Sequence, residues 1–158
     1  MTFRLLNVVA PASLVCLMLL QPVYSAKPTG LLANFQRAGA VLESSRGVCL
    51  LLDIYIARTR EQQSQGLMFV EQMDEFEGML FIYGRPAQLT MWMKNTYIPL
   101  DMVFMNKDGE IASIVKNTTP QSTKRISSGR PVTMVLELNA GFTDRWEIER
   151  GNRLLLVE

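Results

Sequence analysis

The sequence predicts an α+β domain that is mostly β, with an antiparallel or mixed sheet curled into a sandwich or partly open barrel and one or two short helices. About seven short stretches rich in apolar and aromatic residues are separated by turn residues, which is typical of such sheets. The crossover helices that a parallel doubly wound fold would need are missing. A chain of 158 residues is long enough for one such domain behind an N-terminal leader.

The N-terminus has the three-part layout of a secretory signal. Arg4 is its one charge, residues 5–20 are predominantly apolar, and a proline and small residues follow. The apolar run is shorter than the ~20 residues that a membrane-spanning helix needs. We therefore expect residues 1–26 to be a secretory signal peptide and the mature protein to be periplasmic or secreted, with no stable membrane insertion after cleavage.

The chain after the signal divides into a leader and one domain. Residues 27–47 mix glycine, proline and serine with scattered apolar positions and are predicted to be a leader or linker. Residues 48–158 form the predicted single β-rich domain. Within it, residues 49–57 alternate between the two faces of an extended chain and predict the first strand.

A short helix is predicted directly after this strand. Thr59 and Gln62 have the spacing of a capping box, and Gly66 suits the C-terminal cap. Residues 106–109 join two further strand-like stretches and end in glycine, which predicts a hairpin. We expect strands over residues 78–83, 89–94, 100–105, 110–115, 132–138 and 153–157, a surface loop over 120–129, and a short helix near 140–146.

Charge and composition disfavour several partners and chemistries. Sixteen Lys and Arg stand against fifteen Asp and Glu, so no global positive field attracts nucleic acid. The chain has no histidine, which removes the usual general base near neutral pH and the commonest zinc ligand. We expect no nucleic-acid partner, no metal and no cofactor.

Five segments occur in one order and spacing that resemble a known family. They are GLMF (66–69), GMLF (78–81), WMKNT (92–96), IPLD (98–101) and LELNAG (136–141). Together they resemble the bacterial and archaeal family catalogued as domain of unknown function 192, over about residues 49–158.

The resemblance implies a compact β-rich domain, often behind an export signal. The family has no established activity to transfer to this chain. Two positions depart from the family pattern: Val70 stands where an arginine commonly follows GLMF, and Asn152 stands where an aspartate is common.

Alternation also groups chemically useful side chains by face. Trp92 and Lys94 share one face of their strand. Asp101 and Glu137 each lie off the apolar face of their own strand. If these strands are neighbours, an aromatic platform, a cation and two carboxylates converge, which suits a sugar or a peptide. Asn95, the polar residue next to Lys94, is added to this group. The candidate ligand-binding residues are therefore Trp92, Lys94, Asn95, Asp101 and Glu137.

A structural interpretation competes at three positions in this stretch. Asn95 and Thr96 suit a turn before Pro99. Asp101 can accept backbone N–H bonds or pair with Lys94 to hold that turn. Turn chemistry alone explains these residue types.

The leading functional hypothesis is an exported envelope binding or accessory domain with a glycan or peptide ligand. The alternative is a hydrolase of envelope glycans that uses Asp101 and Glu137 as a carboxylate pair, a chemistry that needs no histidine. A weaker alternative is copper binding by the thioether sulfurs of Met91 and Met93. Both methionines lie on the core side of an alternating strand, so gap filling in the core also explains them.

Overall fold

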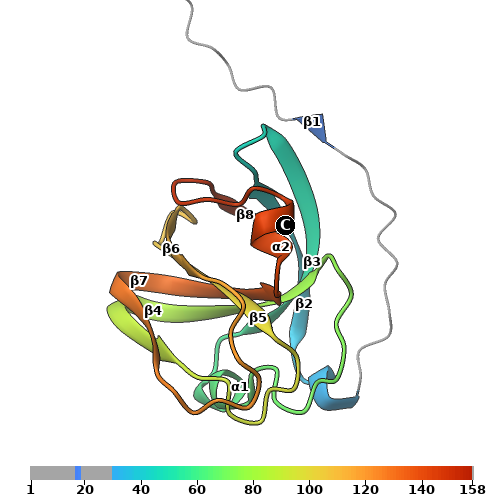
Figure 1. Ribbon diagram of the computed structural model, residues 1–158, viewed down its shortest axis with the longest axis vertical. Coiled ribbons are helices and arrows are strands. Elements are labelled where there is room, and N and C mark those ends of the chain that lie inside the picture. Colours follow the sequence, from blue (N-terminus) through green and yellow to red (C-terminus); the bar gives the residue numbers. More distant parts are fainter. Residues whose placement is uncertain (1–16, 19–29, 158) are drawn as a thin grey trace, which may run out of the picture.

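One mixed, curled sheet organises the described part of the chain. The computed structural model describes residues 17–18 and 30–157. The strands follow the spatial order β6-β5-β7-β4-β3-β2-β8, with β1 beside β3 off this path, and the sheet curls into a half-barrel (Figure 1). Two short helices accompany the sheet, so the predicted fold class is confirmed.

Neighbouring strands on this path are antiparallel, except that β3 and β4 run parallel. The helices are α1 (Arg60–Gln65) and α2 (Phe142–Arg145), with a 3-10 turn at Gly30–Leu32. The strands are β1 (Leu17–Met18), β2 (Gln36–Glu43), β3 (Val48–Ala57), β4 (Glu77–Met91), β5 (Leu100–Met105), β6 (Ile111–Val115), β7 (Ile126–Asn139) and β8 (Leu154–Val157).

The two edges of the half-barrel meet where β6 and β8 begin. Glu110, before β6, forms a bridge with Arg153, before β8. The Leu154 N–H donates a hydrogen bond to the Gly109 carbonyl oxygen at 3.0 Å. Gly109 has a φ of 77°, and a Cβ there would lie 2.1 Å from the Leu154 carbonyl oxygen. The contact between the two edges therefore requires glycine at this turn.

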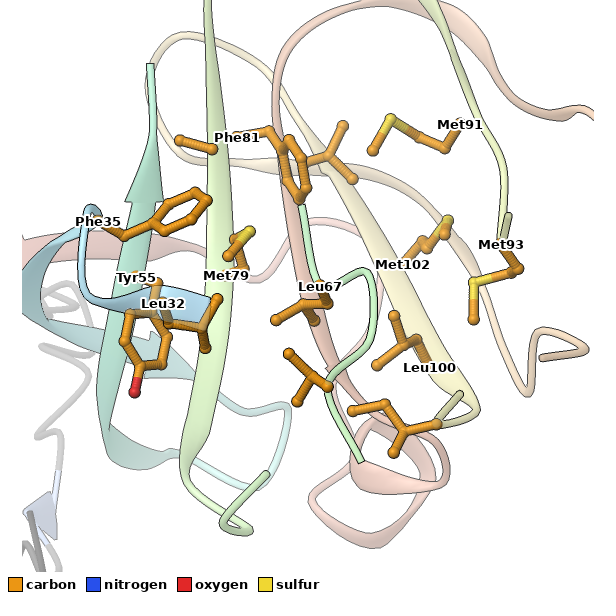
Figure 2. Packing of buried hydrophobic residues seen from close by; sticks show 14 of the residues in the cluster. Leu32, Phe35, Tyr55, Leu67, Met79, Phe81, Met91, Met93, Leu100 and Met102 are labelled. Atoms are coloured by element: carbon orange, nitrogen blue, oxygen red, sulfur yellow. The ribbon is translucent and has the colours of Figure 1, made fainter. Parts of the chain in front are cut away.

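The sheet buries apolar side chains on both of its faces. α1 and α2 lie on opposite sides of the β4–β7 pair (Figure 1), and we name the two clusters the α1-side core and the α2-side core. Figure 2 shows part of the α1-side core, where Leu67 enters from the segment after α1. The α1-side core includes Tyr55, Ala57, Leu67, Met79, Phe81, Met91, Met93, Leu100, Met102, Phe104 and Val135. The α2-side core includes Ala40, Leu42, Leu50, Leu52, Ile54, Ile56, Leu80, Val103, Leu136, Leu138 and Phe142.

Two of the local strand predictions are confirmed in detail. The even-numbered residues of β3 from Leu50 to Ile56 face the α2-side core, whereas Tyr55 faces the α1-side core. β5 and β6 form the predicted hairpin, in which the Asn106 N–H donates to the Glu110 carbonyl oxygen at 3.0 Å. Alternation and turn residues were sufficient signals because both act over a few neighbouring residues.

β2 is a strand where none is predicted, and β7 begins before its predicted first residue. Residues 27–47 are predicted to be a leader or linker, whereas β2 pairs with β3 on one side and with β8 on the other. Only Ala40 and Leu42 of β2 are buried, so its apolar pattern is too sparse to predict a strand. β7 begins at Ile126, inside the loop predicted over 120–129.

β4 joins two predicted strands. Residues 78–83 and 89–94 are predicted as separate strands, but β4 runs from the first into the second and ends at Met91. Its pairing with β7 shifts register between Ile82 and Ala87, where a glycine and a proline lie. These residues mark an irregularity within one strand, because a bulge can absorb them without ending the ladder.

The predicted signal peptide, residues 1–26, lies outside the described residues except for Leu17–Met18. Among the helices of the described residues, none has the length and apolar character needed to cross a membrane.

Gly109→Ala should lower the free energy of unfolding by about 3 kcal/mol or more, because positive φ and a backbone clash act together. Gly47→Ala is the matched control, since Gly47 also has a positive φ of 74° but open space where a Cβ would lie. The control should lose about 1 kcal/mol. Urea unfolding measures both variants, and equal losses would show that the edge contact does not constrain this turn.

Candidate functional site

α1 forms where the sequence places its caps. The Thr59 hydroxyl accepts a hydrogen bond from the Gln62 N–H at 3.2 Å, and the Gln62 side chain accepts one from the Thr59 N–H at 3.1 Å. Gly66 ends the helix with a φ of 48°. A Cβ on Gly66 would lie 3.2 Å from the Phe81 ring, so the glycine also lets the helix end approach β4. The predicted capping box and C-cap are confirmed.

The segment between β4 and β5 folds back against the segment that follows α1. The Thr96 N–H donates to the Met93 carbonyl oxygen at 3.1 Å, across a turn in which Asn95 has a φ of 57°. The Phe69 N–H donates to the Asn95 carbonyl oxygen at 2.8 Å. Phe69 itself has a φ of 65°, a strained conformation for an aromatic residue. These hydrogen bonds join two segments that lie far apart in the sequence.

A cleft of about 300 Å³ lies where α1, these two segments and the sheet meet. Its lining mixes polar and charged side chains with apolar and aromatic ones. The lining residues are Arg60, Gln63, Ser64, Gln65, Gly66, Leu67, Met68, Phe81, Tyr83, Thr90, Met91, Trp92, Lys94, Thr96 and Glu137.

Glu137 is the one carboxyl group among the described residues that line the cleft. It lies on β7 opposite Met79 of β4 and Met102 of β5, and only 4% of its surface is exposed. Burial raises the pKa of Glu137 to about 8. Within the described part of the chain, no hydrogen bond or ion pair partners its carboxyl group. Its oxygens keep contact with the cleft, since Thr133 Oγ1 is the one fully buried side-chain oxygen or nitrogen without a partner among the described residues.

The Tyr83 phenol interacts electrostatically with Glu137. Burial, and then the charge of Glu137, raises the pKa of Tyr83 to about 12. Its hydroxyl donates to the Met91 sulfur at 3.7 Å. The phenol therefore stays protonated over the pH range in which Glu137 titrates.

Three of the five predicted site residues share the cleft. Trp92 is 53% exposed and lies with the exposed Lys94 at the cleft, while Glu137 is buried in it. Asn95 is not among the lining residues. Its left-handed backbone and the bond from Phe69 to its carbonyl oxygen give it the turn role that the structural interpretation describes.

Asp101 lies on the other face of the sheet and does not join the cleft. It pairs with Leu138 of the α2-side core and is fully buried. One carboxylate oxygen accepts the Asn117 N–H at 2.9 Å. The other accepts the Thr143 N–H at 3.0 Å and the Thr143 hydroxyl at 2.6 Å. Asp101 therefore anchors α2 and the Asn117 turn, and the sheet separates it from Glu137.

Met91 and Met93 belong to the α1-side core, so the core interpretation of these residues is confirmed. Met93 is fully buried, and its sulfur accepts a hydrogen bond from the Thr118 hydroxyl at 3.2 Å. In the residues that the structure describes, no group of three or more Cys, Asp or Glu side chains could hold a metal ion.

Several cleft residues were missed by the sequence-based prediction. Arg60 and Gln63 line the cleft from α1, and their spacing of three places them on one side of a helix. Tyr83 follows Phe81 at the spacing of two that shares a face of a strand. The sequence contains both spacings. It does not show which part of the sheet α1 packs against, because that depends on contacts between residues far apart in the sequence.

The comparisons with known proteins place the chain in one family. The family model DUF192, described as "Uncharacterized ACR", matches residues 39–156. No curated protein matches the chain.

Two solved structures are similar over most of their length. One is a protein from Sinorhizobium meliloti 1021 designated a "putative transcription regulator", with 41% identity, a TM-score of 0.76, and coverage of 77% of this chain and 95% of that chain. The other is a protein of unknown function from Novosphingobium aromaticivorans DSM 12444, with 30% identity, a TM-score of 0.76, and coverage of 84% and 94%.

Asp101→Ala should lower the free energy of unfolding by about 3 kcal/mol or more, because three donors lose a charged acceptor in a buried site. Asp108→Ala is the control, since Asp108 is exposed in the β5–β6 turn. Urea unfolding at neutral pH compares the two. A loss below about 1 kcal/mol for Asp101→Ala would contradict the anchoring role.

The free energy of unfolding of Glu137→Gln should increasingly exceed that of the wild type as pH rises, because the wild type loses stability and the variant does not. The pKa of Glu137 is raised from 4.5 to about 8 in the folded protein. The folded state therefore holds this proton more tightly than the unfolded state, and wild-type stability is lost as pH rises from about 4.5 through 8. Glutamine does not ionise, so the variant avoids this loss, by up to about 5 kcal/mol.

Urea unfolding from pH 5 to pH 9 measures this difference. Glu71→Gln is the control, because Glu71 is exposed and should follow the wild-type profile. Parallel profiles for the wild type and Glu137→Gln would mean that Glu137 is satisfied in the folded protein.

Proposed function

The chain belongs to the DUF192 family, and we propose that it is an exported binding domain of the cell envelope that holds a saccharide in the cleft between α1 and Trp92. Export follows from the predicted signal peptide. The saccharide follows from the side chains that meet in the cleft.

The observation that carries this proposal is the unpartnered carboxyl of Glu137. Burying a carboxyl without donors is unfavourable, and its pKa of about 8 reflects that cost. No contact within the described chain compensates for it. A sugar hydroxyl entering the cleft supplies both a donor and an acceptor, so it can bond Glu137 in either protonation state.

Trp92 supports a ligand that has a flat apolar face as well as hydroxyl groups. An exposed indole offers a large rigid contact surface at small conformational cost. Lys94 and Gln63 line the same cleft and can donate hydrogen bonds to oxygen atoms. A sugar ring has this combination of an apolar face and a polar edge, whereas a purely apolar ligand would leave Glu137 unsatisfied.

The lone carboxyl favours binding over two-carboxylate hydrolysis. Glycoside hydrolysis by a carboxylate pair places the two groups about 5 to 10 Å apart on either side of one bond. Asp101 points to the opposite face and is already occupied by Asn117 and Thr143. We therefore propose that the cleft binds a saccharide reversibly and does not hydrolyse it with a carboxylate pair.

We also propose that the ligand is not nucleic acid. The Sinorhizobium meliloti protein is designated a transcription regulator, but we do not extend that role to this chain. In this chain the net charge is +1, and α1 and α2 span six and four residues. Helices of this length cannot act as a recognition helix in the major groove.

Trp92→Ala should weaken saccharide binding about ten- to a hundredfold, because truncating a stacked aromatic anchor typically costs that much. Glu137→Ala should weaken it similarly, since the ligand hydroxyl loses its partner. Leu156→Ala is the control, because Leu156 is also exposed but lies on β8. Titration of the purified protein with N-acetylglucosamine oligosaccharides and soluble peptidoglycan fragments, followed by NMR chemical shifts, measures all three.

The proposal fails if no saccharide in this panel binds the wild type at millimolar concentration. It also fails if binding occurs but Trp92→Ala and Glu137→Ala leave it unchanged. Unfolding curves of each variant confirm that the comparison is made between folded proteins.

A further inference from the structure

We propose that a second cavity, separate from the cleft, binds a phosphate group through Lys124, Arg125 and the hydroxyl groups of Ser122 and Ser127. The cavity has a volume of about 290 Å³ and is lined by the loop after β6 and the first residues of β7. We call these four residues the phosphate site. The proposal does not depend on the saccharide cleft.

The cavity and the cleft are distinct sites on either side of the segment that follows β4. Met93 lines the cavity, whereas its neighbours Trp92 and Lys94 line the cleft. The Met93 N–H donates a hydrogen bond to the Ser122 carbonyl oxygen at 2.9 Å, which joins this segment to the loop after β6. None of the described residues lines both sites. A ligand in the cavity therefore contacts a different set of side chains.

The loop that lines the cavity is bonded to the core through its backbone. Thr118 is buried, its N–H donates to the Leu100 carbonyl oxygen at 2.9 Å, and its hydroxyl accepts from the Leu100 N–H at 3.1 Å. Further along the loop, the Gln121 N–H donates to the Thr96 carbonyl oxygen at 3.0 Å. The cavity is therefore largely preformed, and a ligand has little chain to order when it binds.

Positive charge at the cavity comes from three side chains. Lys116, Lys124 and Arg125 line it, and no carboxyl group is among its lining residues, all of which belong to the described chain. Lys116 shares its charge with Asp144, whose Oδ1 lies 2.5 Å from the lysine Nζ. Asp101 binds the same loop from inside the protein, where three donors already satisfy its charge. The charges of Lys124 and Arg125 therefore favour an anion in the cavity.

Two serine hydroxyls at the cavity are arranged as donors. The Ser127 hydroxyl accepts hydrogen bonds from the Gln88 side-chain amide at 2.9 Å and from the Gly129 N–H at 3.1 Å. The Ser122 hydroxyl accepts one from the Lys124 N–H at 3.2 Å. A hydroxyl has two acceptor positions and one proton, so Ser127 can only donate to a further partner. Within the described residues neither hydroxyl proton has an acceptor, so an oxyanion can receive both.

A phosphate group fits these donors better than a carboxylate. It carries about 1.5 to 2 negative charges at neutral pH and three strong acceptor oxygens. It can therefore contact a lysine and an arginine at once, and the arginine fork matches two of its oxygens. A carboxylate carries one charge and would leave one of these two cations uncompensated. Free phosphate and a phosphate ester share this chemistry.

Titration of the isotope-labelled protein with inorganic phosphate at neutral pH and constant ionic strength, followed by amide NMR shifts, tests the proposal. The shifts should saturate at millimolar concentration and be concentrated in residues 116–127. Acetate, a carboxylate, should bind at least about fivefold more weakly. Glycerol 3-phosphate distinguishes the two sources of the group. Affinity equal to that of inorganic phosphate or higher indicates an ester, and lower affinity indicates the free ion.

Charge variants locate the binding site. Lys124→Ala and Arg125→Ala should each weaken phosphate binding about two- to fivefold, because each removes one exposed charge contact. The double variant should lose about fivefold to twentyfold. Arg150→Ala is the matched control, because it removes an exposed positive charge from the turn before β8. It should leave the phosphate affinity unchanged.

A pair of hydroxyl variants tests the donors. Ser122→Ala should weaken phosphate binding about two- to fivefold, since one hydrogen bond to the anion is lost. Thr123→Ala is the control, because Thr123 is exposed and adjacent but does not line the cavity. Unfolding curves of all variants confirm that folded proteins are compared.

Several results would overturn the proposal. It is rejected if phosphate causes no saturable shifts, or if the shifts lie in α1 and around Trp92 instead. Equal losses in Arg150→Ala and Arg125→Ala would show a general charge effect, and acetate binding as tightly as phosphate would reject the phosphate assignment. Trp92→Ala should not change phosphate affinity, and Arg125→Ala should not change saccharide affinity, so this proposal and the proposed function can fail separately.

Discussion

The antiparallel pairing of β4 with β7 is the contact on which the rest of the structure depends. Gly78 lies opposite Leu138, where a Cβ would meet the Glu137 carbonyl oxygen at 2.8 Å. Because successive side chains of a strand point to opposite faces, both strands contribute residues to two separate cores. Each face then needs a cover, from α2 on one side and from the segment around Leu67 on the other. The cleft lies beside the second cover.

Two carboxyl groups on neighbouring strands illustrate how strongly the choice of face decides a residue's role. Asp101 pairs with Leu138 and Met102 pairs with Glu137, so the two acids are adjacent along the ladder and point in opposite directions. Asp101 receives three hydrogen bonds that satisfy its charge. Glu137 receives none from the described residues, and its pKa rises to about 8. One acid stabilises the fold, whereas the other lines the cleft.

Local structure was more predictable from this sequence than the site was. Alternation, turn residues and the capping box act over a few residues, so β3, α1 and the β5–β6 hairpin follow from them. Trp92 was correctly grouped with Glu137, but Asp101 was not. Alternation assigns faces only within a strand. The more apolar face of β5 and that of β7 are opposite faces of a sheet that is buried on both sides. The pairing of β2 and the position of Arg60 depend on contacts distant in sequence.

The parallel pair of β3 and β4 has a consequence for where the cleft lies. Parallel neighbours need a long connection that carries the chain back to the same end of the sheet. Residues 58–76 make that connection, and α1 and the Gly66–Met68 stretch within it form one wall of the cleft. The parallel pairing therefore requires this connecting segment, although the segment is not itself a strand of the sheet. The connection that lets β3 and β4 run parallel therefore also supplies one wall of the cleft.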